Sequence, residues 1–150
     1  MLDIIINDLP SYAKFLSYQK QNPNINITIK KIHLTNTDIT IFTLPNVVKI
    51  EEDFIIENNY ELKIITNTEH LTQIGGHFRI VDNWYLRSIN GFDNLENILS
   101  NQNKITSLGC ETSDFFTSCK RGFVIKNNWN LENLPKFTNL RFPDDKVGDE

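Results

Sequence analysis

The sequence of 150 residues lacks any apolar run near the roughly 20 residues that a membrane-spanning helix needs. It also lacks an excess of basic residues, because 15 Lys and Arg stand against 19 Asp and Glu, for a formal net charge of −4. A net negative charge disfavours binding to nucleic-acid phosphates and to anionic membranes. We therefore expect no nucleic-acid partner and no membrane partner.

Cysteine is scarce, with only Cys110 and Cys119 in the chain. Two cysteines are too few for a disulfide framework. They could pair across a short loop or stay as thiols, and the sequence leaves both states open. The first eight residues contain an acid where a signal peptide has basic residues, and their apolar run is only three residues long. We expect no secretion signal, which slightly favours a cytoplasmic location.

Residues that carry chemistry do not gather into a catalytic or metal-binding pattern. None of His33, His70 and His77 has metal-ligand spacing with a cysteine or another histidine, and we expect His33 and His77 at the surface. Asp53 and Glu57 share one strand face, but about 3.3 Å per residue puts them about 13 Å apart, too far for glycoside hydrolysis. We therefore expect no enzyme, metal or cofactor, with a polysaccharide-cleaving enzyme as a distant alternative.

Isoleucine and asparagine are abundant, with 20 of each. Isoleucine favours strands and asparagine favours turns, so the composition indicates many short strands separated by tight turns. The pattern Phe-x-Ile-x-(Asn/Asp)-Asn-(Tyr/Trp)-x-Leu occurs in residues 53–62, 77–86 and 122–131. Repeats at this spacing are typical of solenoids.

The spacing of the repeats predicts how many coils the chain contains. Asn59 and Asn83 are 24 positions apart, whereas Asn83 and Asn128 are 45 apart, close to two periods. We therefore predict a degenerate copy near position 103, in residues 97–105. Residues 32–39 form a weaker copy with Thr37 at the Asn position, and a second apolar motif precedes the strands at residues 47–50, 71–74 and 95–98. Together these copies predict about five coils of about 20 to 25 residues.

The best copy, residues 71–92, reads Leu-x-x-Ile-Gly-Gly-x-Phe-x-Ile-x-x-Asn-x-x-Leu-x-x-Ile-x-Gly-Phe. This pattern resembles the receptor L-domain branch of leucine-rich repeat proteins. The resemblance covers roughly residues 30–140. It implies a short right-handed solenoid that binds proteins or glycans and does not catalyse a reaction.

Alternation along each strand predicts which side chains form the core. The inward pairs are Phe54 with Ile56, Phe78 with Ile80, and Phe123 with Ile125. The asparagines that follow, at 59, 83 and 128, are expected to form a buried ladder that satisfies backbone groups of neighbouring coils. Gly75 and Gly76 are expected to adopt positive φ at a coil corner.

The two ends of the chain differ from the repeats. Asp8 or Ser11 can cap a helix that runs to about Gln21 and ends at Asn22-Pro23, with Leu9, Tyr12, Phe15 and Leu16 on one face. We expect this helix to cover the first coil. The prediction is one mostly β domain: an N-terminal strand and helix cap in residues 1–24, repeats in 25–140 and a polar tail in 141–150.

The outward side chains of the stacked strands supply the main candidate binding surface. One predicted row contains His33, Ile55, Arg79, Leu99 and Val124, and a second contains Thr35, Glu57, Val81, Asn101 and Lys126. Ile55, Val81, Leu99 and Val124 form an apolar band edged by Arg79, Glu57 and Lys126, which is the composition of a protein interface. The alternative is that a loop or a terminus covers this face.

A column of aromatic residues is the second candidate surface. Tyr60, Trp84 and Trp129 each follow a ladder asparagine, and Tyr85 lies beside them. Exposed aromatic residues can anchor a protein partner or stack on sugar rings, although they could instead pack on one another. The sequence thus predicts a non-catalytic module that recognises a protein (an inhibitor or immunity-type protein, an effector or an adhesin module), with glycan binding as the alternative.

One segment interrupts the repeats. Residues 110–119 lengthen the coil that contains them, and such extra length predicts a protruding loop that could carry binding. The alternative is that Phe115 and Phe116 tuck onto the core. The sequence leaves the oligomeric state open.

Overall fold

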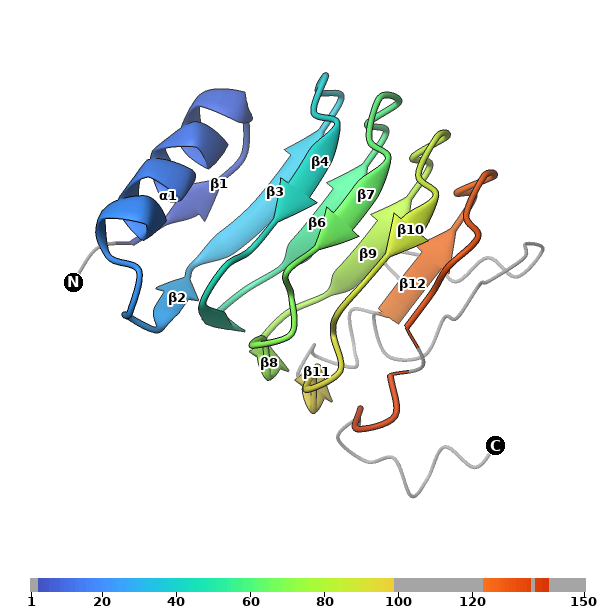
Figure 1. The fold of residues 1–150 in the computed structure, drawn as a ribbon. Helices are drawn as coiled ribbons and strands as arrows, with labels where there is room; N and C mark the ends of the chain where they lie inside the picture. The colour runs from blue at the N-terminus through green and yellow to red at the C-terminus, as the bar shows by residue number, and fades with distance from the viewer. Residues whose placement is uncertain (1–2, 99–122, 136, 141–150) are drawn as a thin grey trace.

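The structure is a computed structural model that describes residues 3–98, 123–135 and 137–140. The predicted mostly β fold with one helix is confirmed in this part of the chain (Figure 1). The elements are β1 (Ile5–Ile6), α1 (Leu9–Gln21), β2 (Ile27–Ile29), β3 (Lys31–Thr35), β4 (Ile41–Thr43), β5 (Val47–Ile50), β6 (Phe54–Glu57), β7 (Ile64–Thr66), β8 (Gln73–Ile74), β9 (Phe78–Val81), β10 (Ser88–Ile89), β11 (Asn97–Ile98) and β12 (Phe123–Lys126).

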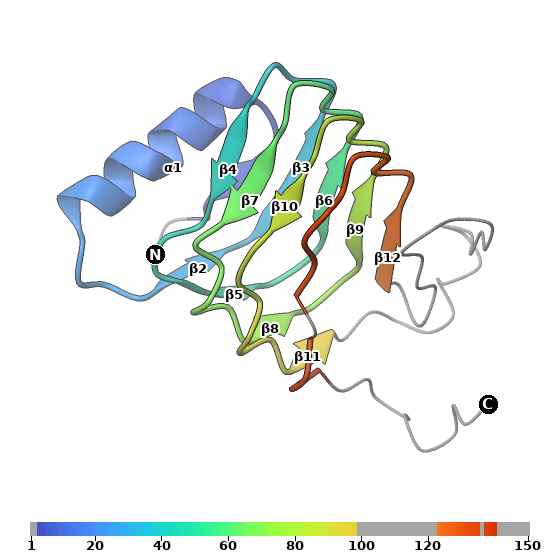
Figure 2. The ribbon, with the colours of Figure 1, turned by 45° about the vertical axis from the view of Figure 1, so that its right-hand side comes forward.

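The described strands form three parallel sheets, with the orders β1-β3-β6-β9-β12, β4-β7-β10 and β2-β5-β8-β11. The chain visits the sheets in a fixed order, so β2, β3 and β4 are followed by β5, β6 and β7 and then by β8, β9 and β10. Each pass therefore adds one strand to each sheet. Figures 1 and 2 show the successive passes lying side by side.

The register of the five-stranded sheet aligns the predicted core pairs. Phe54, Phe78 and Phe123 are direct partners across β6, β9 and β12, and Ile56, Ile80 and Ile125 are partners in the same strands. All six side chains are buried, as predicted. Identical residues stack because the Phe and the ladder Asn are the same number of positions apart in each of the three repeats. Stacking extends the core from one pass to the next, which no single pass could build alone.

Aromatic rings form a continuous spine through this core. The Phe54 and Phe78 ring centroids lie 5.2 Å apart, and the Phe78 and Phe123 centroids lie 4.8 Å apart, with nearly parallel rings. Phe92 and Phe137 meet Phe78 edge-on from the other side of the interior, at 5.4 and 5.9 Å. Such stacked and edge-to-face pairs are the favourable arrangements for aromatic rings.

The predicted asparagine ladder is present. The Asn83 side-chain nitrogen donates to the Ile56 carbonyl at 3.0 Å, and its oxygen accepts the Asn59 backbone N–H at 3.0 Å. Asn128 repeats both contacts on the next pass, to the Ile80 carbonyl and the Asn83 N–H. Asn59 bonds Leu34 and Thr37 in the same way, and Thr37 adds a hydroxyl contact to it. The ladder thus satisfies backbone groups that burial removes from water.

The prediction of a repeat copy near position 103 is wrong for this sheet. β12 pairs directly with β9, so no other strand of this sheet lies between them. Twenty-five positions separate Ile98 of β11 from Phe123 of β12, whereas four separate Ile74 of β8 from Phe78 of β9. The connection before β12 thus carries 21 extra residues, close in number to one repeat. The predicted segments 97–105 and 110–119 fall mostly or wholly outside the described residues.

The weaker copies elsewhere form the strands that they predict. Residues 32–39 contain most of β3, and Thr37 takes the ladder position next to Asn59. The upstream motifs at 47–50, 71–74 and 95–98 contain β5, β8 and β11, which pair in one parallel sheet. The second motif therefore marks a second sheet on each pass.

The N-terminal helix matches its prediction in both bounds. Asp8 is the N-cap, with its carboxylate accepting the Ser11 N–H at 2.8 Å, while the Ser11 hydroxyl accepts the Asp8 N–H at 3.1 Å. This reciprocal capping box satisfies two donors at the helix start. The helix ends at Gln21 with Asn22 as C-cap. Leu9 is exposed, contrary to the prediction, because it is the first helical residue and lies at the margin of the packed face.

The helix packs on β4 at the β1 end of the stack (Figure 2). Tyr12 and Phe15 are buried, and the Tyr12 ring centroid lies 5.0 Å from that of Phe42. The Tyr12 hydroxyl accepts the Thr43 backbone N–H at 2.9 Å. β4 is the terminal strand of its sheet, so this contact satisfies an edge group that would otherwise remain unpaired.

The Tyr12→Phe variant should lose about 1 to 3 kcal/mol of folding free energy, because the Thr43 N–H loses its partner beneath the helix. Burial raises the pKa of Tyr12 above its ordinary value of 10.0. The wild-type contribution is therefore full below pH 10 and is lost as the pH rises through the folded-state pKa. Urea unfolding at neutral and alkaline pH measures both effects. A variant as stable as wild type at neutral pH would contradict this account.

The predicted role of Gly75 and Gly76 is wrong. Positive φ occurs at Gly91, whereas neither Gly75 nor Gly76 has it. A Cβ on Gly75 would overlap the Glu51 carbonyl, and one on Gly76 would overlap the Asp53 carboxylate and the Glu52 backbone. These glycines let two passes of the chain approach closely, and the left-handed turns fall mostly on asparagine.

Candidate binding surface

Four aromatic side chains stand exposed along one edge of the fold, and we call them the aromatic ridge: Tyr60, Trp84, Tyr85 and Trp129. Each exposes between 47% and 54% of its surface. They lie in the turns that follow β6, β9 and β12, which Figure 1 shows side by side. The exposure expected for Tyr60, Trp84 and Trp129 is therefore present.

The local sequence explains why the ridge residues leave the core. Asn58, Asp82 and Asn127 end their strands with φ between 57° and 60°, in the left-handed region that Asn and Asp tolerate. This reversal turns the next residue, the ladder asparagine, into the interior. The residue after it, Tyr60, Trp84 or Trp129, then points away from the core. The repeated pair of polar residues thus positions one aromatic side chain on each pass.

Neighbouring contacts hold the ridge together. The Trp84 and Trp129 ring centroids are 6.2 Å apart and the rings are tilted by 56°. The Asn130 side-chain nitrogen donates to the Trp84 carbonyl at 2.7 Å, which links the last two passes. The tryptophans therefore contact each other, as the alternative interpretation expected, yet about half of each remains open to solvent.

The outward face of the five-stranded sheet differs from the prediction. Ile55, Val81, Val124 and Lys126 were expected to be exposed, but none is more than 8% exposed. Arg79 stands in register between Ile55 and Val124, and Val81 stands between Glu57 and Lys126. The prediction that these four side chains are exposed is therefore wrong, because alternation along a strand sets which face a side chain takes but not what packs over that face.

Arg79 and Glu57 are engaged with each other. The Arg79 Nε lies 2.5 Å from a Glu57 carboxylate oxygen, and the two side chains are only 17% and 22% exposed. They occupy diagonal positions on β9 and β6, within reach of long side chains. The predicted interface rim is therefore an internal ion pair of the sheet. Leu99 and Asn101, which complete the predicted rows, lie outside the described residues.

The three histidines differ in exposure. His33 and His70 are exposed, as expected for His33, but His77 is only 8% exposed, so its predicted surface position is wrong. His77 comes directly before β9, and its backbone N–H donates to the Asp53 carboxylate at 2.8 Å. Within residues 3–98, 123–135 and 137–140, no three His, Cys, Asp or Glu side chains gather in a way that could hold a metal ion. Cys110 and Cys119 fall outside these ranges.

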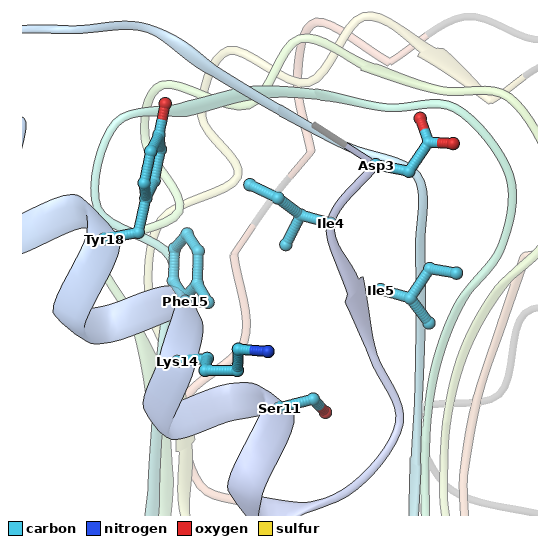
Figure 3. Close-up of a pocket in the computed structure, with 7 residues that line it drawn as sticks. All are labelled: Asp3, Ile4, Ile5, Ser11, Lys14, Phe15 and Tyr18. Atoms are coloured by element: carbon cyan, nitrogen blue, oxygen red, sulfur yellow. The ribbon is translucent and has the colours of Figure 1, made fainter. Parts of the chain in front are cut away.

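A groove of about 300 Å³ lies between the N-terminal strand segment and α1, lined by Asp3, Ile4, Ile5, Ser11, Lys14, Phe15 and Tyr18. Ile4 points across it toward Phe15, whereas Ile5 points to the other side of the strand (Figure 3). No helix among the described residues is long and apolar enough to cross a membrane.

Sequence reasoning missed a smaller pocket beside the ridge, lined by Lys63, Tyr85, Arg87 and Asn130. Lys63 lies four residues after Asn59, and Arg87 lies four residues after Asn83. Aligning the repeats beyond the aromatic position would have shown this pair of cations at equivalent places.

In the part of the chain that the structure describes, the fold is mostly β, with one helix and parallel sheets. No family model, no curated protein and no solved structure matches the chain. Its function is therefore argued from its own geometry.

Proposed function

We propose that the chain is a non-catalytic recognition module that binds a protein partner through the aromatic ridge. The observation that carries this proposal is the exposure of four large aromatic side chains in the turns that follow three aligned strands. Monomeric proteins rarely leave such side chains gathered on one surface without a use for them. Tryptophan and tyrosine dominate the energetic centres of protein interfaces.

We further propose that the scaffold is a short solenoid of the leucine-rich repeat type, similar to receptor L domains. The fixed order of the strands on each pass and the parallel pairing of equivalent residues support it. So do the asparagine ladder and the Phe spine, which repeat one contact from pass to pass. A solenoid displays equivalent turns in a row, so a single aromatic position per repeat becomes a continuous surface.

The ridge replaces the outward strand face as the main contact surface. Ile55, Val81 and Val124 are buried, and Arg79 is engaged with Glu57, so this face offers little apolar area. Trp84 and Trp129, predicted at the edge of the interface, become its centre. The partner class stays the same, while the surface moves from the strands to the turns that follow them.

A glycan is the second candidate ligand, and the half-exposed faces of the tryptophans favour it as well. The 56° tilt between the Trp84 and Trp129 rings favours a protein, because the two rings do not present one flat platform to a sugar. A protein partner can place different side chains against each of the two tilted rings.

We expect the double variant Trp84→Ala with Trp129→Ala to lose a protein that wild type retains from a lysate of the source organism. The measurement is quantitative mass spectrometry of the bound proteins, followed by binding of the purified candidate. The control is Ile25→Ala, which removes an exposed apolar side chain far from the ridge in sequence. Equal retention by all three proteins would contradict the proposal. Binding to a glycan array that the double variant loses would support the second candidate instead.

A further inference from the structure

The pocket beside the ridge is continuous with it. Tyr85 belongs to both, and Asn130, which lines the pocket, donates its side-chain N–H to the Trp84 carbonyl at 2.7 Å. The pocket has a volume of about 220 Å³, large enough for one side chain of a partner but not for a separate domain or helix. A ligand on the ridge therefore lies next to this pocket.

The two charged side chains that line the pocket are both cations. Lys63 and Arg87 hold equivalent places on successive passes, and the Arg87 backbone N–H donates to the Lys63 carbonyl at 2.9 Å. Adjacent parallel strands are about 4.8 Å apart, so the two like charges start from neighbouring positions. Both residues are exposed, and among the described residues neither makes an ion pair. Like charges at such neighbouring positions are destabilising, so stability does not account for the pair.

Acidic residues frame the pocket without lining it. Glu61 precedes Lys63 by two residues, and the Glu132 backbone N–H donates to the Arg87 carbonyl at 2.8 Å, so Glu132 follows in the same row. Both acids are exposed, and neither forms an ion pair with the two cations. The formal charge of the whole chain is −4. Lys63 and Arg87 therefore attract an anion only when it is close to the pocket, because the net charge of the chain is negative.

We infer that the pocket receives the carboxylate of an aspartate or glutamate side chain of the protein partner, while apolar residues next to it lie on the aromatic ridge. A guanidinium can bind a carboxylate with two parallel N–H donors, and a lysine ammonium supplies a third. The inference rests on the proposed function of the ridge and adds the chemistry of its partner. The partner segment is an acidic residue flanked by apolar residues.

The test selects binders to immobilised wild type from a displayed library of short random peptides that lack tryptophan. The selected sequences should carry Asp or Glu next to apolar residues. A synthetic peptide of the selected sequence should bind at least about tenfold more weakly to the Lys63→Glu, Arg87→Glu variant. Changing its acid to Gln or Asn should weaken binding to wild type to a similar extent. The matched control, Lys14→Glu with Lys20→Glu on α1, makes the same change in net charge and should bind as wild type does.

The outcomes separate this inference from the proposed function. Neutral or basic selected sequences, or equal binding to the Lys63→Glu, Arg87→Glu variant, would overturn the carboxylate inference. If such peptides still lost binding on Trp84→Ala with Trp129→Ala, the ridge would stand as a protein-binding surface. Peptides that ignore both pairs of substitutions, or a selection that enriches nothing, would contradict both proposals. If only the Lys14→Glu, Lys20→Glu control lost binding, the net charge of the chain would explain the effect. That result would overturn the inference that the pocket binds a carboxylate.

Discussion

Replacing Phe78 with alanine is expected to lower the free energy of unfolding by about 3 to 5 kcal/mol, a large share of the stability of a typical domain. The Phe78 ring is fully buried and contacts Phe54 and Phe123 on either side. It also meets Phe92 and Phe137 edge-on. Alanine would leave a cavity in the middle of the spine, and close neighbours on four sides limit how far it can collapse.

Urea or guanidinium unfolding followed by far-UV circular dichroism measures this loss. Phe78→Leu keeps most of the volume and should lose much less, so a stability difference remains measurable if the alanine variant does not fold. Tyr60→Ala is the surface control, since that ring is half exposed and outside the spine. A loss below about 1 kcal/mol for Phe78→Ala would show that the spine does not organise the core.

Replacing Asn83 with leucine is expected to cost about 2 to 5 kcal/mol, although leucine has the same branched side-chain shape and is more apolar. The change removes the acceptor of the Asn59 N–H and the donor to the Ile56 carbonyl. Both groups belong to the previous pass and lie in the buried interior next to a fully buried Asn59. Each orphaned backbone group costs about 1 to 3 kcal/mol when water cannot reach it.

The matched control is Asn94→Ala. Asn94 also donates its side-chain N–H to a carbonyl of the previous pass, that of Glu69 at 2.7 Å, but it is exposed. Water can replace this contact, so we expect a loss within about 0.5 kcal/mol. If Asn83→Leu were as harmless as Asn94→Ala, or stabilising, the ladder would not be needed to hold neighbouring passes together.

The sequence predicted the parts of the fold that depend on local repetition. Inward Phe and Ile pairs, the ladder asparagines and the capping box at Asp8 each follow from residue types at short spacing. Their physical causes are the alternation of strand side chains and the hydrogen bonds that buried or terminal backbone groups need. Such patterns can be predicted from one sequence because the residues that cause each local structure lie within a few positions of one another.

The number of passes could not be predicted from local patterns. The connection before β12 carries 21 extra residues, almost one repeat, so the 45-residue interval between Asn83 and Asn128 imitates two periods. Spacing alone cannot separate a degenerate repeat from an insertion of similar length. The pairing of Phe78 with Phe123 decides between them, and that pairing is a long-range contact.

The solvent exposure of side chains on the strands could not be predicted from the sequence either. Alternation places Ile55 and Val124 on the outward face, but they are only 8% and 4% exposed. What packs over a face depends on tertiary contacts, which alternation within one strand does not determine. His77 is likewise only 8% exposed, although strand alternation places it on the outward face. Trp84 and Trp129 were easier to place, because a left-handed turn before each ladder asparagine directs the next side chain outward.

The central claim, that the aromatic ridge is the binding surface, can be tested through the fluorescence of the chain itself. Both of its tryptophans, Trp84 and Trp129, lie on the ridge, so all of its tryptophan emission reports on that surface. We would measure acrylamide quenching before and after saturation with a tryptophan-free peptide from the selection. The account predicts strong quenching of the free chain and clear protection in the complex, with a shift in the emission maximum. Unchanged quenching and emission at saturation would show that the peptide binds elsewhere and would contradict the claim.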